Sequence, residues 1–311
     1  MVKQTLHIHG GCDIGARPID LHLKSFEKLG INVEQKYGEI ICKTEKIKGQ
    51  RIDLDFPSVG ATENIILASI FCIGKTIITN AAREPEIVDL QNFLNRMGAK
   101  VEGAGTNKII ITGVNDLKDV SYNIMPDRIE TGTFLCIAAA TNGNLVLEHT
   151  NYEHVIPIIN KLEEAGCKIN LVKDKIEIQG VKKIKNMDIK TMPYPGFPTD
   201  MQSVFCSMLT IAHGTSVIVE NIFENRYKYA QELNKMGAQI TIEGKSAVIR
   251  GVKKLYGANV KATDLRGGAS LVLAGLIANG NTKIDNIEYI LRGYENFDEK
   301  LRKIGAKIYI I

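Results

Sequence analysis

One short pattern recurs five times in this chain of 311 residues and limits what the chain can fold into. In each copy a glycine ends an amphipathic segment, and a run of alternating apolar and polar residues follows it. The glycines are 68, 68, 71 and 68 residues apart, at Gly30, Gly98, Gly166, Gly237 and Gly305. Glycine commonly ends a helix, and alternation is typical of a strand. The sequence therefore predicts an internal repeat.

The segment 61–113 shows what one repeat contains. Its two predicted helices differ in character, because the first is almost wholly apolar and the second carries apolar residues on one face only. The predicted elements are a helix over 61–73 that ends at Gly74, a strand over 75–79, a helix over 84–97, and strands over 99–103 and 108–113. We expect this helix, strand, helix, strand, strand order in every unit, with a strand at 120–124 leading into the next unit.

Such units cannot bury both of their helices alone, so the helices must pack on one another with the small sheets outside. Apolar helices begin near residues 61, 130, 199 and 265. The first 50 residues lack this apolar helix, and the last unit has room for only one strand of its final pair. The fold class predicted is α/β (α+β), built of repeated units grouped into compact lobes.

Composition excludes several classes of protein. The chain is 44% hydrophobic and 24% charged, which is ordinary for a globular protein. Its longest apolar stretch, nine residues at 65–73, is shorter than the roughly 18 of a spanning helix, and the N-terminus has no apolar signal-peptide core. Six unspaced cysteines form neither a disulfide framework nor a zinc pattern. We expect a cytoplasmic protein with no metal, no cofactor and no membrane partner. The net charge of +4 is too small to indicate nucleic-acid binding.

Cys12 lies in the loop Gly-Gly-Cys-Asp-Ile-Gly-Ala-Arg-Pro. Its glycine neighbours allow close approach of a ligand, while Arg17 and a helix predicted to begin at Pro18 supply positive potential that favours a thiolate. The pattern indicates a reactive cysteine, although most cysteines are small buried apolar residues. The other five are predicted to be buried and structural: Cys42, Cys72, Cys136, Cys167 and Cys206.

Arginine placement suggests recognition of anions. Lysine outnumbers arginine almost three to one, yet six of the ten arginines fall in short loops: Arg17, Arg83, Arg128, Arg226, Arg266 and Arg292. The planar guanidinium group matches carboxylate and phosphate oxygens in pairs. The alternative, that such arginines cap helices or form surface ion pairs, accounts for about half of them.

Eight ordered motifs together resemble the UDP-N-acetylglucosamine 1-carboxyvinyltransferases over essentially the whole chain. They are GGCDIGARPIDLHL, SVGATENI, NAAREPEIVDL, PDRIETGTFL, FPTDMQ, FENRY, ATDLRGGASLVLAG and RGYENFDEKL. The resemblance implies two inside-out α/β lobes of the enolpyruvyl transferase type. The expected domains are a partial N-terminal lobe at 1–124 that carries the cysteine loop, and a C-terminal lobe of three units at 125–311. The first lobe is expected to be truncated, because members carry roughly 100 residues before this loop.

The resemblance implies transfer of the enolpyruvyl group of phosphoenolpyruvate to the 3′-hydroxyl of UDP-N-acetylglucosamine, with release of phosphate, at the start of peptidoglycan synthesis. An alkene must gain a proton while a weakly acidic hydroxyl loses one. Cys12 matches the family residue that supplies the proton and can add covalently to phosphoenolpyruvate. Asp200 matches the carboxylate that accepts the hydroxyl proton, and Arg292 completes the implied catalytic set.

The substrate-binding residues implied by the resemblance fall into two groups. Contacts to phosphoenolpyruvate are expected from Arg17, Arg266 and Arg292, with Arg226 a further candidate and Asp264 beside them in the DLRGG motif. Contacts to the nucleotide sugar are expected from Arg17, Pro18, Ile19, Asp20, Leu21, Phe56, Pro57, Ser58, Val59 and Ile222. The Phe56–Pro57 pair departs from the lysine-containing version of some members. Glu84, Asp127 and Arg128 are expected at the boundary between the lobes.

Two other interpretations remain open at this point. The chain could be a 3-phosphoshikimate 1-carboxyvinyltransferase, although that chemistry uses no cysteine nucleophile and so disfavours this reading. It could also be a truncated copy that is not catalytic, or that acts only with a separately supplied N-terminal fragment. Whichever interpretation holds, a lobe shortened at its N-terminus should expose apolar helix surface near 65–73.

Overall fold

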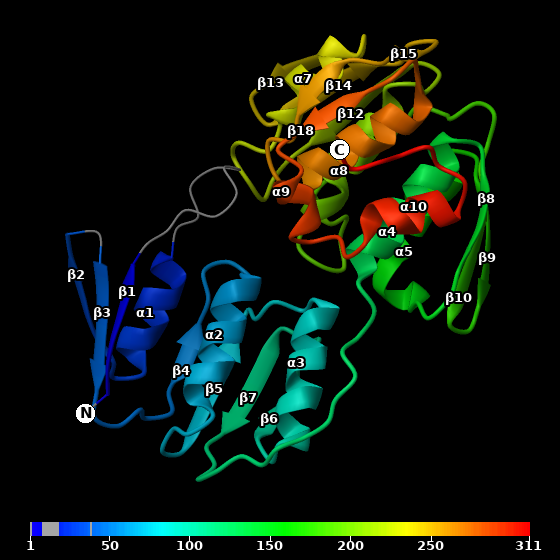
Figure 1. The fold of residues 1–311 in the computed structure, drawn as a ribbon. Helices are drawn as coiled ribbons and strands as arrows, with labels where there is room; N and C mark the ends of the chain where they lie inside the picture. Colours follow the sequence, from blue (N-terminus) through cyan, green and yellow to red (C-terminus); the bar gives the residue numbers. More distant parts are fainter. Residues whose placement is uncertain (1, 8–18, 38) are drawn as a thin grey trace. The chain divides into compact units, whose positions relative to one another are not determined.

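The computed structural model describes residues 2–7, 19–37 and 39–311, which divide into two compact units of mixed α/β structure (Figure 1). The first unit holds the described residues up to 125 together with 193–195. The second holds 126–192 and 196–311. Each unit has its own hydrophobic core.

The first unit alternates short strands with three helices. Its elements are β1 (Val2–His7), α1 (Asp20–Lys28), β2 (Asn32–Lys36), β3 (Glu39–Thr44), β4 (Arg51–Asp53), α2 (Val59–Ser69), β5 (Lys75–Thr79), α3 (Pro85–Arg96), β6 (Lys100–Glu102) and β7 (Lys108–Thr112). Its strands form one sheet in the order β1-β3-β2 and another in the order β4-β5-β7-β6.

The second unit repeats this pattern with more helix. Its elements up to the middle are α4 (Arg128–Ala140), β8 (Asn144–Leu147), η1 (Tyr152–Val155), α5 (Ile156–Glu164), β9 (Lys168–Val172), β10 (Lys175–Gln179), β11 (Ile189–Lys190), η2 (Thr199–Met201), α6 (Gln202–Leu209) and β12 (Thr215–Val219). The remainder are α7 (Tyr229–Lys235), β13 (Gln239–Glu243), β14 (Ser246–Arg250), β15 (Leu255–Tyr256), β16 (Asn259–Lys261), α8 (Leu265–Ile277), β17 (Ala278–Asn279), β18 (Lys283–Asp285), α9 (Glu288–Leu291) and α10 (Phe297–Lys303).

The predicted repeat is confirmed in its element order and its sheets. In the first unit β4 runs parallel to β5, which pairs antiparallel with β7, and β7 pairs with β6. In the second unit β11, β12, β14 and β13 are arranged in the same way. All five repeat glycines have φ values between 85° and 105°, a left-handed conformation that glycine adopts without strain. The repeated glycine therefore ends each amphipathic helix, and after the first four of these glycines a hairpin begins.

Apolar helices form the centre of the second unit. Every residue of α6 is buried, as are nearly all residues of α4, and α6 and α8 pack on each other and on α4. The sheet β8-β10-β9 lies along the outer side of α4 and α5, and β12 to β14 lie outside α6 and α8 (Figure 1). The expected arrangement, with buried helices inside and small sheets outside, is confirmed for this unit.

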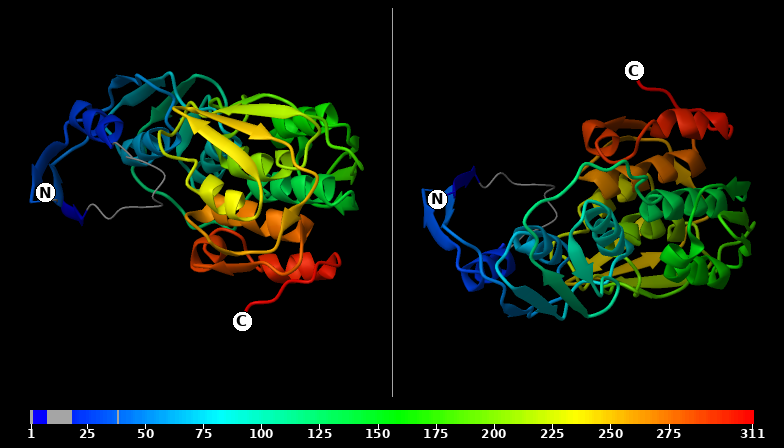
Figure 2. Two further views of the ribbon diagram at one scale, coloured as in Figure 1. Left: turned by 90° about the horizontal axis from the view of Figure 1, so that it is seen from above. Right: turned by 90° about the horizontal axis from the view of Figure 1, so that it is seen from below.

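Two predicted strands are absent from the described structure. Residues 120–124 form no strand; Tyr122 instead donates a hydrogen bond to Asp89 on α3 at 2.8 Å and stacks edge-on against Phe93. Residues 306–311 also lack strand pairing; the chain after α10, red in Figure 2, is irregular, and its Ala306 and Ile308 pack against the core of the second unit. An alternating run forms a strand only where a neighbouring strand offers its backbone groups, and the described residues provide none at either place.

Helix α2 is less buried than the corresponding helices of the second unit. Within α2, Ile65 and Ile66 are fully buried and Leu67 is 50% exposed. Just after the helix, Phe71 and Ile73 are exposed by 58% and 56%. The expected exposure of apolar surface near 65–73 is thus confirmed for part of the stretch, in α2 and in the residues just after it.

Close packing explains the paired glycines of the DLRGG motif. A Cβ atom added at Gly268 would lie 2.4 Å from Cγ1 of Ile290 on α9. We therefore expect Gly268→Ala to lower the free energy of unfolding by about 1–3 kcal/mol, as overpacked core positions do. Urea denaturation followed by circular dichroism measures the change. Gly275→Ala is the control, since its added Cβ would first meet Thr282 at 3.3 Å and alanine favours the helix. Equal stability of the two variants would contradict the packing argument.

Candidate active site

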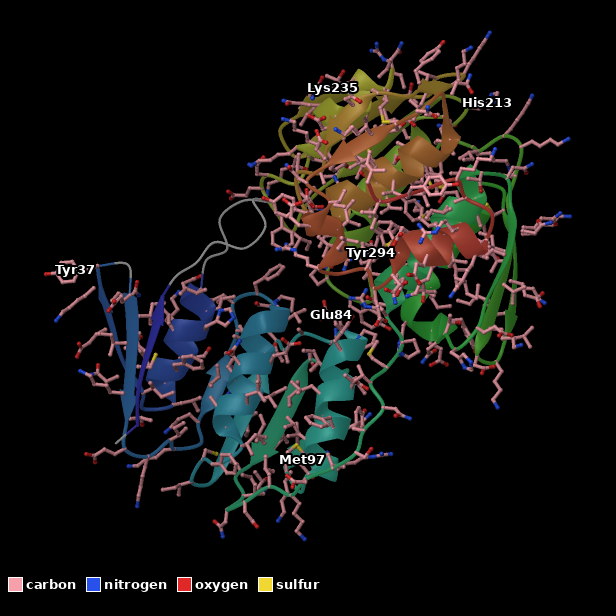
Figure 3. All side chains as sticks on the ribbon, in the orientation of Figure 1. Tyr37, Glu84, Met97, His213, Lys235 and Tyr294 are labelled. Carbon is pink, nitrogen blue, oxygen red and sulfur yellow. The ribbon has the colours of Figure 1, made fainter. Side chains whose placement is uncertain are left out.

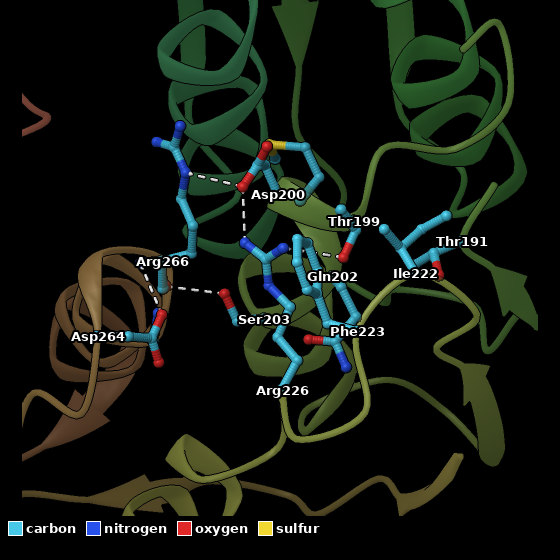
Figure 4. A network of polar contacts seen from close by, with 12 residues as sticks. Thr191, Thr199, Asp200, Gln202, Ser203, Ile222, Phe223, Arg226, Asp264 and Arg266 are labelled. Carbon is cyan, nitrogen blue, oxygen red and sulfur yellow. Dashed lines mark hydrogen bonds and ion pairs between the residues drawn. The ribbon is translucent and has the colours of Figure 1, made fainter. Parts of the chain in front are cut away.

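A carboxylate held between two arginines is the most unusual polar feature of the second unit (Figure 4). Oδ1 of Asp200 accepts a hydrogen bond from Nη2 of Arg226 at 2.6 Å and a longer one from Nε of Arg266 at 3.5 Å. The Arg226 side chain is only 4% exposed and that of Arg266 14%, whereas Asp200 is 38% exposed. The carboxylate is therefore open to solvent on one side and bound to buried positive charge on the other.

Three separate segments bring these residues together. Asp200 lies in η2, the single turn that precedes the buried helix α6. Arg266 is in the first turn of α8, where Asp264 caps the helix by accepting from the amides of Arg266 and Gly267 at 3.1 and 2.9 Å. Arg226 lies in the loop between β12 and α7. Each residue is thus positioned by a helix start or a short loop, where side chains can point toward a ligand.

Additional contacts fix the orientation of both guanidinium groups. Arg226 Nη1 donates to Thr199 Oγ1 at 2.9 Å, and its guanidinium lies 5.0 Å from the centre of the Phe223 ring. The guanidinium of Arg266 lies 5.2 Å from the ring of Tyr294, which is labelled in Figure 3. Aromatic faces attract such cations. The Tyr294 hydroxyl in turn lies 3.0 Å from the hydroxyl of Thr133 on α4.

The surrounding charges make Asp200 a strong acid. Loss of contact with water raises the pKa of its carboxyl, but the positive charges of Arg226, Arg266 and Arg128 outweigh this and hold the pKa at about 2. Asp200 is therefore ionised throughout the neutral range.

The two guanidinium groups still have unused hydrogen-bond donors. Nε of Arg226 and Nη1 of Arg266 are buried and have no hydrogen-bond partner among the described residues. Two positive charges also face one carboxylate. Buried donors without acceptors are costly, so this cluster is suited to bind a further anion with several oxygen atoms.

The structure brings together some of the residues that the sequence predicted and leaves others apart. Asp200, Arg226 and Arg266 meet, and Asp264 lies beside them as the cap of α8. Ile222 is half-buried in the loop that leads to Arg226. Arg292, by contrast, is exposed at the end of α9, with its guanidinium 5.8 Å from the Tyr289 ring. The described contacts of Asp200 come from Arg226 and Arg266, not from Arg292.

The residues expected at the boundary between the lobes make defined local contacts in the described structure. Asp127 caps α4 by accepting from the amides of Ile129 and Glu130 at 2.7 and 3.0 Å. Arg128 is buried in the first turn of that helix and contributes to the potential at Asp200. Glu84 is buried in the first unit, where its Oε1 accepts from the amide of Tyr194 at 3.4 Å.

The expected nucleotide contacts in the first unit fall at the starts of two helices. Ile19, Asp20 and Leu21 lie where α1 begins, and Ser58 caps α2 by accepting from the amide of Ala61 at 3.3 Å. The other expected contacts near α2 are Phe56, Pro57 and Val59, of which Phe56 is 42% exposed. Cys12, Arg17 and Pro18 lie outside the described residues, so their predicted roles remain predictions.

The five other cysteines behave largely as predicted. Cys72, Cys136, Cys167 and Cys206 are buried, and Cys42 is half-buried in β3. Burial raises the pKa of the Cys206 thiol to about 12 and that of Cys167 to about 11. These thiols are therefore protonated at neutral pH and unsuited to nucleophilic chemistry.

Several residues of the cluster were not found by sequence reasoning. Thr199 and Tyr294 lie inside recognised motifs. The only sequence signal for them was that each is close in sequence to a predicted site residue, Thr199 to Asp200 and Tyr294 to Arg292. Thr133 also lies inside a recognised motif, PDRIETGTFL. Thr191 and Glu220 gave no signal, because they reach the cluster from other segments of the chain. Among the helices that the structure describes, none combines the length and apolar composition needed to cross a membrane.

Comparison with known proteins first identifies the fold class of this chain. Residues 1–301 match the family model of EPSP synthase (3-phosphoshikimate 1-carboxyvinyltransferase). Two solved structures share the fold: the enolpyruvyl transferase NikO from Streptomyces tendae, with a TM-score of 0.86 and 23% identity over 95% of this chain and 73% of that one, and EPSP synthase from Acinetobacter baumannii, with a TM-score of 0.74 and 22% identity over 99% and 75%. The protein therefore has the enolpyruvyl transferase fold, as predicted.

Curated relatives then identify the family to which this chain belongs. UDP-N-acetylglucosamine 1-carboxyvinyltransferase 1 of Caldanaerobacter subterraneus subsp. tengcongensis is 57% identical over 96% of this chain and 72% of its own length. The corresponding enzyme of Thermodesulfovibrio yellowstonii is 53% identical over 98% of this chain and 74% of its own length. This chain belongs to the UDP-N-acetylglucosamine 1-carboxyvinyltransferase family, and it spans about three quarters of the length of these relatives.

Proposed function

We propose that this protein transfers the enolpyruvyl group of phosphoenolpyruvate to the 3′-hydroxyl of UDP-N-acetylglucosamine and releases phosphate, a step of peptidoglycan synthesis. The observation that supports this most directly is the cluster of Asp200, Arg226 and Arg266. It combines a solvent-accessible carboxylate with buried guanidinium donors that have no partner among the described residues. Family membership narrows the substrates that such a cluster would serve.

The proposed reaction uses both the carboxylate of Asp200 and the guanidinium groups of Arg226 and Arg266. In the first step the sugar oxygen bonds to C2 of phosphoenolpyruvate, C3 takes up a proton, and the hydroxyl proton passes to Asp200. In the second step the C2–phosphate bond breaks and C3 loses a proton, which restores the alkene in the product. The carboxylate and phosphate keep their negative charges throughout, and fixed guanidinium groups stabilise them at little reorganisation cost.

Substrate binding would also adjust the basicity of Asp200. With a pKa of about 2 the carboxylate is a weak base, because Arg226 and Arg266 hold its charge. An anionic substrate would share the same two guanidinium groups and weaken their hold on Asp200. The carboxylate would then become more basic when phosphoenolpyruvate is in place, at the stage where a proton must be accepted.

The remaining assignments follow from the family and are part of the same proposal. Cys12 would deliver the proton to C3, and Arg17 and Arg292 would contact phosphoenolpyruvate. The starts of α1 and α2, together with Ile222, would contact the nucleotide. The two units would correspond to the lobes expected at 1–124 and 125–311, and a cytoplasmic location is retained as a prediction.

Phosphate release by the purified chain tests the proposal. The chain is incubated with phosphoenolpyruvate and UDP-N-acetylglucosamine, free phosphate is measured, and the nucleotide product is identified by mass spectrometry. We expect phosphate and enolpyruvyl nucleotide in equal amounts, and neither with Cys12→Ala. Turnover with 3-phosphoshikimate in place of the nucleotide, or no product from the unmodified chain with either acceptor, would refute the assignment.

A further inference from the structure

Glu220 is a buried carboxylate that lies one residue beyond the end of β12 and takes no direct part in the proposed chemistry. It is 1% exposed and accepts four hydrogen bonds. Its Oε1 accepts from the hydroxyl of Thr191 at 2.9 Å and from the amides of Ile222 and Phe223 at 2.8 and 3.2 Å. Its Oε2 accepts from the hydroxyl of Thr199 at 2.8 Å. One side chain thus joins three segments of the chain around the active site.

These contacts fix the direction of two hydroxyl groups. A threonine hydroxyl has a single proton to donate. Because Thr199 gives its proton to Glu220, its oxygen is left to accept from Nη1 of Arg226, at 2.9 Å. Thr191 likewise donates to Glu220 and accepts from the amide of Asn221, also at 2.9 Å. Hydrogen bonds in such a chain polarise and strengthen one another.

The orientation of Arg226 depends on this chain of contacts. Its guanidinium is fixed by Asp200, by the Thr199 oxygen and by the ring of Phe223. Glu220 controls two of these three partners, since it receives the Thr199 proton and holds the Phe223 amide. The Arg226 side chain keeps little freedom to turn away from Asp200.

We propose that Glu220 is a positioning residue that acts through Thr199 and the 221–223 loop to hold Arg226 in the orientation that receives phosphoenolpyruvate. This inference rests on the proposed function for the identity of the anion. In this role Glu220 touches neither the substrate nor the reacting atoms. It orients the buried guanidinium of Arg226 through Thr199 and the 221–223 loop.

The variant Glu220→Gln separates this role from simple loop stability. The Gln oxygen can still accept from Thr191 and from both loop amides. Its amino group replaces Oε2 and cannot accept the Thr199 proton, so the Thr199 oxygen must receive two donors while its own proton loses its acceptor. We expect a phosphoenolpyruvate dissociation constant about 3–10 times higher, the loss of roughly one hydrogen bond, with UDP-N-acetylglucosamine affinity unchanged.

Thr199 supplies the matched variants. Thr199→Val should weaken phosphoenolpyruvate binding to the same extent, and Thr199→Ser, which keeps the hydroxyl, should restore it. The double variant Glu220→Gln/Thr199→Val should bind no more weakly than the worse single variant, because both changes break one chain of contacts. Glu232→Gln is the control: Glu232 is also buried and accepts from the amide of Lys261 at 3.0 Å, but its described contacts do not reach the cluster. It should lower the melting temperature and leave both affinities unchanged.

Calorimetric titration measures the affinities, and NMR measures hydrogen exchange at the Arg226 Nε–H group, assigned with an Arg226 variant. Faster exchange in Glu220→Gln and Thr199→Val, but not in Glu232→Gln, supports the positioning role whether or not the chain binds phosphoenolpyruvate. If the unmodified chain fails to bind phosphoenolpyruvate, the proposed function falls while the exchange rates still decide the role of Glu220. Unchanged exchange, or losses of affinity that multiply in the double variant, would overturn the inference.

Discussion

Replacing Asp200 by asparagine is expected to lower kcat for enolpyruvyl transfer by roughly 10²–10⁴-fold, the range typical for loss of a general base. The same change removes the only carboxylate that the structure shows bound to Arg226 and Arg266, which frees both guanidinium groups for an anionic ligand. The phosphoenolpyruvate dissociation constant should therefore stay the same or decrease. Steady-state kinetics together with a binding titration separate these two effects.

Asp298→Asn provides the matched control. Asp298 also accepts from an arginine, at 2.7 Å from Arg302 Nη1, and its side chain is 16% exposed. This variant should keep its kcat, because its ion pair lies within α10, outside the cluster. If Asp200→Asn retained full activity, or lost activity only because phosphoenolpyruvate no longer bound, Asp200 would not be the base.

Replacing Arg226 by methionine is expected to lower kcat/KM for phosphoenolpyruvate by roughly 10²–10³-fold, the usual cost of removing a fixed donor to a charged reacting group. Methionine is apolar and flexible enough to pack against the Phe223 ring. The change also removes the positive charge that lowers the pKa of Asp200 most, so that pKa should rise from about 2 toward the ordinary value for aspartate.

This shift in pKa predicts a distinctive pH dependence. Asp200 must be ionised to accept a proton, so activity falls as the pH drops through its pKa. In the unmodified protein that fall lies near pH 2, below the working range. In Arg226→Met it moves upward, and the ratio of variant to unmodified kcat/KM should decrease as the pH falls from about 5 to about 3.

The protonation of phosphoenolpyruvate changes with pH in the same way for both proteins, so its effect cancels in the ratio of variant to unmodified kcat/KM. Arg302→Met, which removes an arginine paired with Asp298 outside the cluster, should give a ratio near one at every pH. A constant ratio for Arg226→Met across this range would show that Arg226 does not set the pKa of Asp200.

The sequence predicted those parts of the fold that depend on local patterns. The repeated glycines and the alternating runs located β5, α3 and β7 to within about two residues, because helix ends and strand alternation are written in neighbouring residues. Buried strand pairing is not local. The runs at 120–124 and 306–311 alternate in the same way, yet they remain unpaired in the described structure because no strand lies beside them.

The candidate site likewise has features that local sequence predicts and features that it does not. Arginine in short loops pointed to Arg226 and Arg266, and the family motif pointed to Asp200. The buried support was hidden from sequence reasoning. Glu220 and Thr191 meet Thr199 only after three separate segments have packed together, and nothing in the neighbouring residues marks them. Local pattern therefore located the charged groups, while the hydrogen bonds that orient them required the structure.

The central claim is that the cluster of Asp200, Arg226 and Arg266 binds the anionic groups of phosphoenolpyruvate. Calorimetric titration of phosphoenolpyruvate into the chain without UDP-N-acetylglucosamine, so that no turnover occurs, tests it most directly. Loss of two charged hydrogen-bond donors in the double variant Arg226→Met/Arg266→Met should weaken binding by roughly 10²–10⁴-fold relative to the unmodified chain. Equal affinity of the double variant and the unmodified chain would contradict the claim.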